Sequence, residues 1–426
     1  MHRRAFIALA LAGCADPQLE PTLTAALGQA QPAGPPPSAP PPPAPVVSGD
    51  PNFDAWLASF RPKAAAAGIP ESVLDRELAG LTPDPRASSL DGRQPEFSKP
   101  VGDYVKGAVT ESRIVQGRQF RDQLPYLSRI ESAYKVPRDI VLAIWAMESA
   151  FGKIQGDMDV IRSLATLAAD GRRRAWAEGE LISALRIIAT GQQSRVALKG
   201  SWAGAMGQTQ FLPGVFLSTA VDGDGDGRRD IWGSTHDALA STANYMAKAG
   251  WKPGESWSRE VRLPAGFDYA LTEQPREPLA TWTERGVRRA DGLPWSAADQ
   301  ASAASLILPS GHTGPAFLIF PNHGAIMKYN NSTAYALGVG LLALRLGGEG
   351  PLVTAWPAEI PLSLADRTLA QQSLVKLGYD TGGVDGAVGP KTRVAIRAWQ
   401  KANNLPADGY LTPPMIQRMA AQAAGS

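Results

Sequence analysis

The stretch Trp145-Ala-Met-Glu-Ser-Ala-Phe-Gly152 places a single carboxylate, that of Glu148, in an apolar run that ends in glycine. Apolar residues recur through this segment at helical spacing and predict the buried face of a helix: Ile140, Ile144, Met147 and Phe151. Residues three or four positions apart are neighbours on a helix, so the acid is predicted to have apolar or small neighbours: Ile144, Trp145, Phe151 and Gly152.

An acid in such surroundings loses the hydration of its charged form, so we expect the pKa of Glu148 to rise. A carboxyl group that stays protonated near neutral pH can donate a proton to a leaving oxygen as a general acid. The alternative is an acid at a helix end that pairs with an arginine, and Lys153 is the only cation within a turn on that face. The helix by itself leaves both interpretations open.

A second segment, Gly200-Ser-Trp-Ala-Gly-Ala-Met-Gly-Gln-Thr-Gln-Phe-Leu-Pro-Gly214, combines small residues with side-chain amides and aromatic rings. Glycines let the backbone turn sharply, and amides with aromatic rings are suited to contacting a polar ligand. This composition favours a groove that a polymer approaches over a packed core.

Several motifs follow one another along residues 53 to 345: Glu148-Ser-x-Phe-Gly, Gly204-Ala-Met-Gly-Gln-Thr-Gln-Phe-x-Pro, Ala243-Asn-Tyr245, Gly314-Pro-Ala-Phe-Leu-Ile-Phe-Pro-Asn322 and Tyr329-Asn-Asn-Ser-Thr-Ala-Tyr335-Ala-Leu. Together they resemble the membrane-bound lytic murein transglycosylase B family. The resemblance implies a mainly α (α+β) fold, in which a lysozyme-like helical catalytic domain carries a small β subdomain. It also implies cleavage of the MurNAc-GlcNAc β-1,4 bond of peptidoglycan, so glycan strands are the expected partner.

The resemblance implies a role for individual residues. Glu148 matches the sole catalytic acid, and six residues match the walls of the substrate groove: Ser201, Gln210, Tyr245, Tyr329, Asn330 and Tyr335. Without the resemblance, Tyr329 and Tyr335 are interpreted as core tyrosines. In the implied reaction, Glu148 protonates the glycosidic oxygen and then removes a proton from the C6 hydroxyl of the same sugar. The product is a 1,6-anhydro-MurNAc end formed without water, whereas ordinary glycosidases use two carboxylates.

Other functions compete with this one. A peptidoglycan amidase or endopeptidase needs zinc ligands or a cysteine nucleophile, but the sequence has no His-Glu-x-x-His motif and its histidines are scattered. A hydrolytic muramidase differs only in that water attacks the sugar, and the sequence does not separate the two. A non-enzymatic anchor that binds the cell wall has no need of a buried acid.

The segment Asp222-Gly-Asp224-Gly-Asp226-Gly227 has oxygen ligands at positions 1, 3 and 5 and glycine at position 6, as in an EF-hand calcium loop. The carbonyl of Arg228 is predicted to fill position 7, but position 12 is Gly233 instead of glutamate. Resemblance to the transglycosylase family implies that Asp237 supplies the bidentate ligand. We therefore expect a structural Ca²⁺ and no cofactor for catalysis; the alternative is a solvated acidic turn.

The only cysteine, Cys14, follows Arg3-Arg4, an apolar run and small residues, an order that looks like a lipoprotein signal peptide. We expect cleavage after residues 1–13 and a lipid anchor on Cys14; the alternative is a plain secretory signal with a chance cysteine. Residues 14–51 are then a Pro-rich tether of extended polyproline II chain. Ala15 in place of aspartate favours, by resemblance to lipoprotein sorting rules, a periplasmic body anchored to the outer membrane.

Length and charge bound the remaining choices. A chain of 426 residues is too long for one ordinary core and predicts two domains with additional segments. Its 42 Lys and Arg against 40 Asp and Glu lack the excess positive charge of a nucleic-acid binder, so no nucleic-acid partner is expected. We expect a monomer.

Residues 52–350 are assigned to the catalytic domain, with a small sheet predicted from three β-branched or apolar segments: Val261-Arg-Leu, Ser305-Leu-Ile-Leu-Pro and Ala316-Phe-Leu-Ile-Phe. Residues 362–421 resemble the peptidoglycan-binding domain 1 family, a three-helix module, through Leu377-Gly-Tyr and Asp385-Gly. Its second helix is predicted to begin at Pro390 and to share one face among three residues: Val394, Ala398 and Trp399. The alternative is a helical appendage without a ligand.

Overall fold

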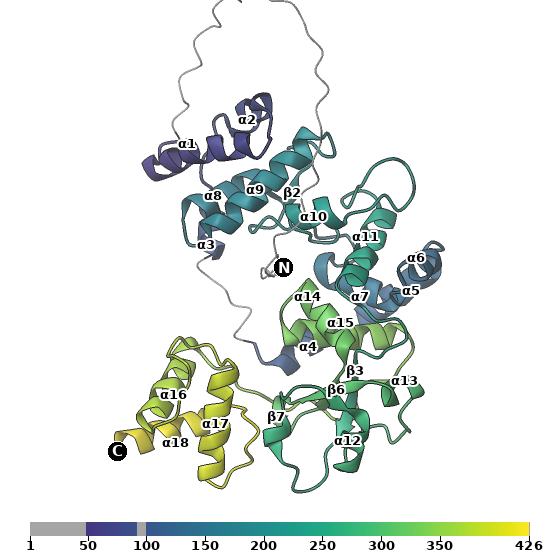
Figure 1. The fold of residues 1–426 in the computed structure, drawn as a ribbon, viewed down its shortest axis with the longest axis vertical. Helices are drawn as coiled ribbons and strands as arrows, with labels where there is room; N and C mark the ends of the chain where they lie inside the picture. The colour runs from purple at the N-terminus through teal and green to yellow at the C-terminus, as the bar shows by residue number, and fades with distance from the viewer. Residues whose placement is uncertain (1–47, 92–98, 426) are drawn as a thin grey trace, which may run out of the picture.

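The structure is a computed structural model that describes residues 48–91 and 99–425 (Figure 1). The predicted signal peptide, the lipid site at Cys14 and most of the predicted tether therefore lie outside the described residues. Among the residues that are described, no helix combines the length and the apolar character needed to cross a membrane.

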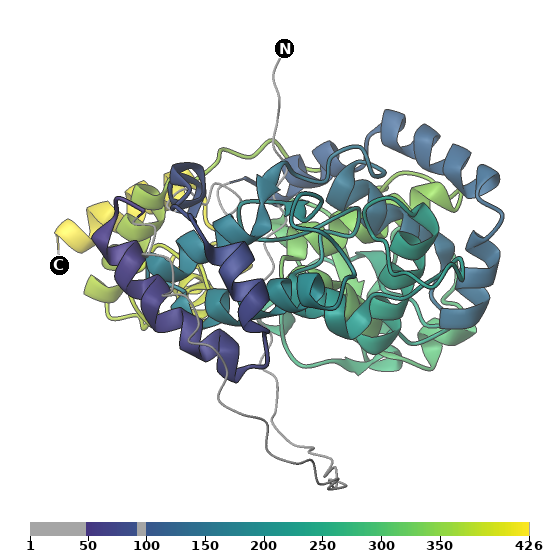
Figure 2. The same ribbon diagram turned by 90° about the horizontal axis from the view of Figure 1, so that it is seen from above.

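The first part of the described chain is helical, as the sequence predicted. Its helices are α1 (Pro51–Ala66), α2 (Glu71–Leu78), α3 (Pro85–Asp91), α4 (Val101–Ala108), α5 (Glu111–Gln123), α6 (Leu127–Tyr134), α7 (Arg138–Ser149), α8 (Val160–Ala169), α9 (Arg174–Ala189), α10 (Pro213–Thr219) and α11 (Thr235–Lys248). A short antiparallel pair, β1 (Met158–Asp159) and β2 (Lys199–Gly200), interrupts them. Figures 1 and 2 show α5 and α6 on the side opposite the C-terminal helices.

Helix α7 is the centre of one of the two hydrophobic cores of this helical part. It begins after Pro137, whose ring suits a helix start, and every residue from Ile140 to Ser149 is buried. It packs against α5, α11 and α15 (Thr333–Leu346). The second core lies around α8 and α9, on which α1, α2 and α3 pack. Helix α7, which carries Glu148, is therefore covered by helices that come before it and after it in the chain.

The predicted small sheet is confirmed. Five strands lie in the order β4-β6-β8-β3-β5, and every neighbouring pair is antiparallel. The strands and the short helices around them are β3 (Ser258–Arg262), the 3-10 helix η2 (Tyr269–Leu271), β4 (Glu277–Pro278), α12 (Leu279–Glu284), β5 (Arg288–Arg289), α13 (Ala297–Gln300), β6 (Ala303–Ile307), β7 (Pro309–His312), β8 (Ala316–Ile319) and α14 (Pro321–Tyr329). The three central strands overlap the three segments singled out in the sequence.

The C-terminal module consists of α16 (Leu364–Lys376), α17 (Pro390–Ala402) and α18 (Pro413–Ala424) around its own core. The predicted face of α17 is wrong, because Val394 is 59% exposed and Ala398 is exposed, whereas Trp399 is buried. The residues of α17 that face the core are Thr392, Ala395, Ile396, Trp399 and Gln400. This face meets α16 and α18 in the core of the module.

The module lies beside the β subdomain (Figure 1), and ion pairs join the two. The carboxylate of Glu273 pairs with Arg393 at 2.8 Å and Arg397 at 2.7 Å, which stand one turn apart on α17. Burial would raise the pKa of Glu273, but hydrogen bonds and charge from the two arginines outweigh it and lower the pKa. A second contact joins His312 Nδ1 of β7 to Asp408 of the module at 2.7 Å. Glu273 also adopts a left-handed backbone (φ 61°), which a non-glycine residue rarely adopts.

We predict that Glu273→Gln loosens this attachment, because the substitution keeps the side chain's shape but removes the charge that two arginines share. Hydrogen bonds to charged groups contribute about 1.5–3 kcal/mol, so proteolytic cleavage of the segment at residues 347–363 should accelerate about tenfold. Glu284→Gln, at an exposed position of α12, is the matched control. Equal cleavage rates for the two variants would contradict a docked module.

Candidate active site

Glu148 lies in the last turn of α7 with only 6% of its surface exposed. Burial raises its pKa to about 8, and a hydrogen bond from the hydroxyl of Tyr335 to Oε1, 2.5 Å long, lowers the pKa by a smaller amount. Tyr335 stands in the first turn of α15, where the side chain of the N-cap residue Ser332 accepts its backbone N–H. A fully buried carboxyl group with one hydroxyl partner is protonated at neutral pH, as the apolar neighbours in the sequence predicted.

The helix ends one turn earlier than the apolar spacing predicted. Ala150, Phe151 and Gly152 all have left-handed backbones, with φ values of 49°, 59° and 80°. Phe151 and Gly152 are therefore not neighbours of Glu148 on a helix surface, and that prediction was wrong. Phe151 instead folds back edge-on against Trp145, with ring centroids 5.3 Å apart. Contacts outside the helix thus decide where it stops.

The alternative interpretation of Glu148 as a helix-end acid paired with a cation is not supported. Lys153 is exposed and forms no ion pair with Glu148, and the hydrogen-bond partner of the acid is a tyrosine. Since no charge offsets the loss of hydration, burial dominates the titration of this carboxyl group.

The loop between β2 and α10 bends tightly beside the acid. Gly204 and Gly207 have φ values of 82° and 66°, and backbone bridges join Met206 to Gly200 and to Phe211. Ser201 Oγ accepts the N–H of Ala205, and Gln210 Nε2 donates to the carbonyls of Gln155 and Gly207. The side chains of Ser201 and Gln210 remain half-buried, so each holds the loop and still reaches its surface.

An aromatic cluster forms beside this loop. Tyr245 of α11 and Tyr329 of α14 meet edge to face with ring centroids 4.7 Å apart, and both pack against Phe211. The hydroxyl of Tyr329 donates to the carbonyl of Thr209 at 2.7 Å. Both tyrosines and Asn330, at the end of α14, are half-buried, whereas Tyr335 is only 3% exposed and contacts the acid. The structure therefore separates Tyr335 from the wall residues with which the sequence grouped it.

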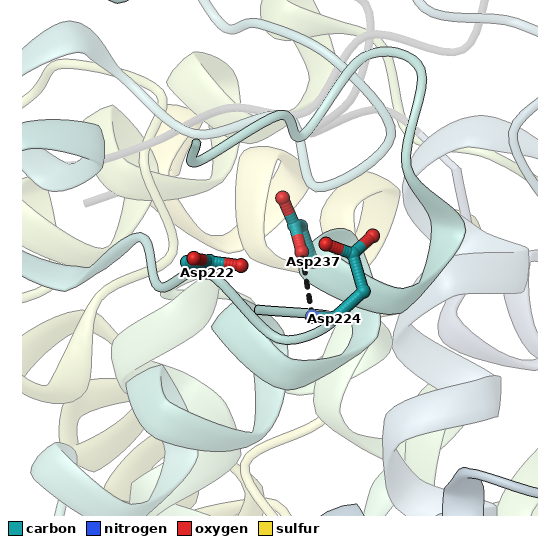
Figure 3. A group of neighbouring side chains, drawn as sticks. All are labelled: Asp222, Asp224 and Asp237. Carbon is teal, nitrogen blue, oxygen red and sulfur yellow. Dashed lines mark hydrogen bonds between the residues drawn. The ribbon is translucent and has the colours of Figure 1, made fainter. Parts of the chain in front are cut away.

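Three of the four predicted metal-binding carboxylates come together, namely those of Asp222, Asp224 and Asp237 (Figure 3). Each offers an oxygen within 4.8 Å of the others. Asp237 is buried at the start of α11 and accepts the backbone N–H groups of three residues: Gly223, Asp224 and Asp230. Asp226 does not belong to this group; it is exposed, and its Oδ1 accepts the N–H of Arg228.

The chemistry of this cluster fits a calcium ion. Carboxylate oxygens are the ligands that Ca²⁺ prefers, and a flexible loop with carbonyl and water ligands completes its coordination. Burial, followed by the charge of Asp224, raises the pKa of Asp237 against the effect of its hydrogen bonds. A divalent cation would offset the repulsion among three acids held this close together.

Sequence reasoning missed Gln208 as a residue of the site. Gln208 is only 4% exposed. Through hydrogen bonds with Trp145 and Trp232, its side chain joins the helix that carries Glu148 to the segment after the acidic loop. Gln208 lies in the Gly200–Gly214 segment, which contains more than one side-chain amide, and the sequence does not indicate which of them is buried. Only the spatial approach of the two segments identifies it.

Known proteins share this architecture. Residues 52–344 match the transglycosylase SLT domain family, and residues 363–419 match the peptidoglycan binding domain family. Membrane-bound lytic murein transglycosylase B of Escherichia coli strain K12 is 32% identical over 251 residues, which cover 55% of this chain and 64% of that protein. The chain thus spans just under two thirds of the length of that relative.

Two solved structures extend the comparison. SltB3 from Pseudomonas aeruginosa, in complex with NAG-anhNAM-pentapeptide, is 49% identical, with a TM-score of 0.83 over 86% of this chain and 99% of that one. Escherichia coli Slt35, in complex with calcium, is 28% identical, with a TM-score of 0.58 over 70% of this chain and 93% of that one. Each relative therefore aligns with most of the described chain.

We predict that Glu148→Gln stabilises the folded chain at neutral pH. The acid holds its proton in the folded state up to about pH 8 but loses it near pH 4.3 when unfolded, so its contribution to stability falls between these values. At pH 7 the variant should exceed the parent by about 3 kcal/mol in the free energy of unfolding, and at pH 4 this difference should vanish. Urea titrations at both pH values measure it, with Glu284→Gln as the control. The same difference at both pH values would contradict a protonated Glu148.

Proposed function

The chain belongs to the transglycosylase SLT domain family, whose relatives named above are lytic transglycosylases, and we propose that it cleaves the MurNAc-GlcNAc β-1,4 bond of peptidoglycan without water. The observation that carries this proposal is the burial of Glu148, which is protonated at neutral pH and hydrogen-bonded to Tyr335. The side chains described around it carry amides, hydroxyls and aromatic rings. Glu148 is proposed to perform both proton transfers.

In the first step, the carboxyl proton of Glu148 moves to the glycosidic oxygen as the bond from that oxygen to MurNAc C1 breaks. An oxocarbenium-like state forms at C1, and Glu148 becomes a carboxylate that accepts a hydrogen bond from the hydroxyl of Tyr335. In the second step, the C6 oxygen of the same sugar attacks C1, and the proton of the C6 hydroxyl moves to Glu148, which becomes a carboxyl group again. Atoms balance without water, and the new end is 1,6-anhydro-MurNAc.

The polymer is proposed to lie along the loop that carries Ser201 and Gln210 and against the aromatic cluster. Tyr245 and Tyr329 present half-buried rings, which stack on the apolar faces of sugars, and Asn330 offers an amide at the edge of the cluster. The SltB3 complex contains an anhydro sugar attached to a peptide, which is the kind of product that this reaction generates.

Two other functions use parts of the same chain. A hydrolytic muramidase would use the same acid but would let water attack C1, giving a reducing end. A non-enzymatic anchor would use the C-terminal module alone, and no contact that it makes would call for burying Glu148. The raised pKa of Glu148 matches a general acid and favours an enzyme over an anchor. The two Escherichia coli relatives, both named lytic transglycosylases, favour transglycosylation over hydrolysis.

We also propose how the enzyme is held at the cell wall. A lipid on Cys14 would attach residues 14–51 to the outer membrane from the periplasmic side, and the tether would let the catalytic domain, 52–350, reach the wall. The module at 362–421 would hold peptidoglycan beside the groove. Palmitate labelling tests the anchor: the parent should be labelled, and Cys14→Ser should not.

The acidic cluster is proposed to bind a structural Ca²⁺ through Asp222, Asp224 and Asp237, with Asp226 and the carbonyl of Arg228 as further candidate ligands. The ion would fix the loop that leads into α11 and would take no part in the chemistry at Glu148. The proposal is supported by the structure of a relative, Slt35, in complex with calcium.

We predict that the soluble chain starting at Gly49 releases fragments from purified sacculi that are lighter than muramidase products by one water. Glu148→Gln should release at least about 10²-fold less, because no other group supplies the proton. Mass spectrometry of the fragments measures both. Ends that borohydride reduces would indicate a hydrolase, and binding without release would indicate an anchor.

We predict that added Ca²⁺ raises the melting temperature by a few degrees, since a ligand that binds only the folded state stabilises it. Asp237→Asn should abolish this shift, because it removes the buried carboxylate of the cluster. The same measurement on Asp226→Asn shows whether the fourth carboxylate also binds the ion. Replacing Ca²⁺ with Mg²⁺ shows whether the site is selective for calcium. An unchanged melting temperature at millimolar Ca²⁺ would leave only a solvated acidic turn.

A further inference from the structure

The turn that follows Glu148 is conformationally strained. Ala150 and Phe151 are consecutive non-glycine residues with left-handed backbones. Each such residue is energetically unfavourable and persists only where its surroundings hold it in place. Because the turn begins two residues after the acid, whatever holds the turn also fixes the end of α7 and the position of the carboxyl group.

Gln208 touches both sides of this turn. Ser149, the residue after the acid, donates its hydroxyl hydrogen to the carbonyl of Gln208 at 2.8 Å, and the same hydroxyl accepts the N–H of Gly152. At Gly152, a Cβ atom would lie 2.7 Å from Oε1 of Gln208, so the amide occupies the space that any larger residue needs. The chain can close here only with glycine against Gln208.

The side-chain amide of Gln208 makes a hydrogen bond at each end. Its Oε1 accepts the indole N–H of Trp145 at 2.9 Å, and its Nε2 donates to the carbonyl of Trp232 at 3.1 Å. The backbone N–H of Gln208 donates to the carbonyl of Ile231 at 2.9 Å. Trp145 stands three residues before Glu148. Gln208 therefore contacts the helix before the acid as well as the turn after it.

Only an amide satisfies both partners. A methionine of similar length would leave the indole N–H of Trp145 and the carbonyl of Trp232 buried without these hydrogen bonds, which is unfavourable for each group. A glutamate in its charged form would face the carbonyl without a proton to donate. The residue type at this position is therefore set by its contacts and not by space alone.

We propose that Gln208 is a positioning residue for Glu148: it clamps the strained turn and Trp145 so that the carboxyl group stays dry and aligned with the hydroxyl of Tyr335. This inference rests on the proposed function, because Glu148 is taken as the acid. The titratable groups that face Glu148 from neighbouring elements are the hydroxyls of Tyr335, from α15, and Tyr329, from α14.

The test is the kinetics of Gln208→Met with the soluble chain and a defined glycan. Because a displacement of about 1 Å costs up to about 10²-fold in rate, we expect kcat to fall about 10- to 100-fold while KM changes less than about twofold. We also expect activity to decline at a lower pH than in the parent, since water that reaches Glu148 restores the ordinary pKa of a carboxyl group. Gln300→Met, at an exposed position on α13, is the matched control.

Trp145→Phe keeps the test decisive if Gln208→Met does not fold. It removes the indole N–H and should change kcat and the pH profile in the same direction by a smaller factor. The double variant should be no slower than Gln208→Met, because both changes break the same contact. A lower melting temperature with the parent's kcat and pH profile would overturn the proposal and leave Gln208 a structural residue. If Glu148→Gln kept its activity, the proposed function would fail first.

Discussion

The hydrogen bond between Tyr335 and Glu148 joins α15 to α7 in the interior of the domain, and the arrangement of the site depends on it. A charged carboxylate cannot be buried without a partner, whereas a neutral carboxyl group bonded to a hydroxyl can. The acid therefore keeps its proton, and the helices can close around it. The same burial that raises the pKa of Glu148 lowers the stability of the folded chain at neutral pH.

The loop beside the acid is shaped mainly by its backbone. Left-handed residues such as Gly207 and Gln210 turn it, and the hydroxyl of Tyr329 is anchored on one of its carbonyls. The rings of Tyr245, Tyr329 and Phe211 pack on one another beside this loop. Gln208 connects the loop to the turn behind Glu148 through hydrogen bonds, so the loop and this turn are held together.

Periodicity in the sequence predicted the helix that carries Glu148 and the small sheet, and resemblance to a known family implied the three-helix module. It failed where an element's end or face depends on a distant contact. The end of α7 is decided by the left-handed turn at Phe151, and the buried face of α17 is decided by α16 and α18, which leave Val394 exposed. Local spacing contains no record of either partner.

The sequence by itself determined that Glu148 would lie among apolar residues and that three aspartates would share one short loop, because neighbours along a chain are fixed by covalent structure. Only the tertiary structure decided which groups from elsewhere complete these sites. Tyr335 reaches the acid from 187 residues away, and Asp237 joins two of the loop's acids from the next helix. Such contacts depend on how helices pack, and packing is settled by the whole core at once.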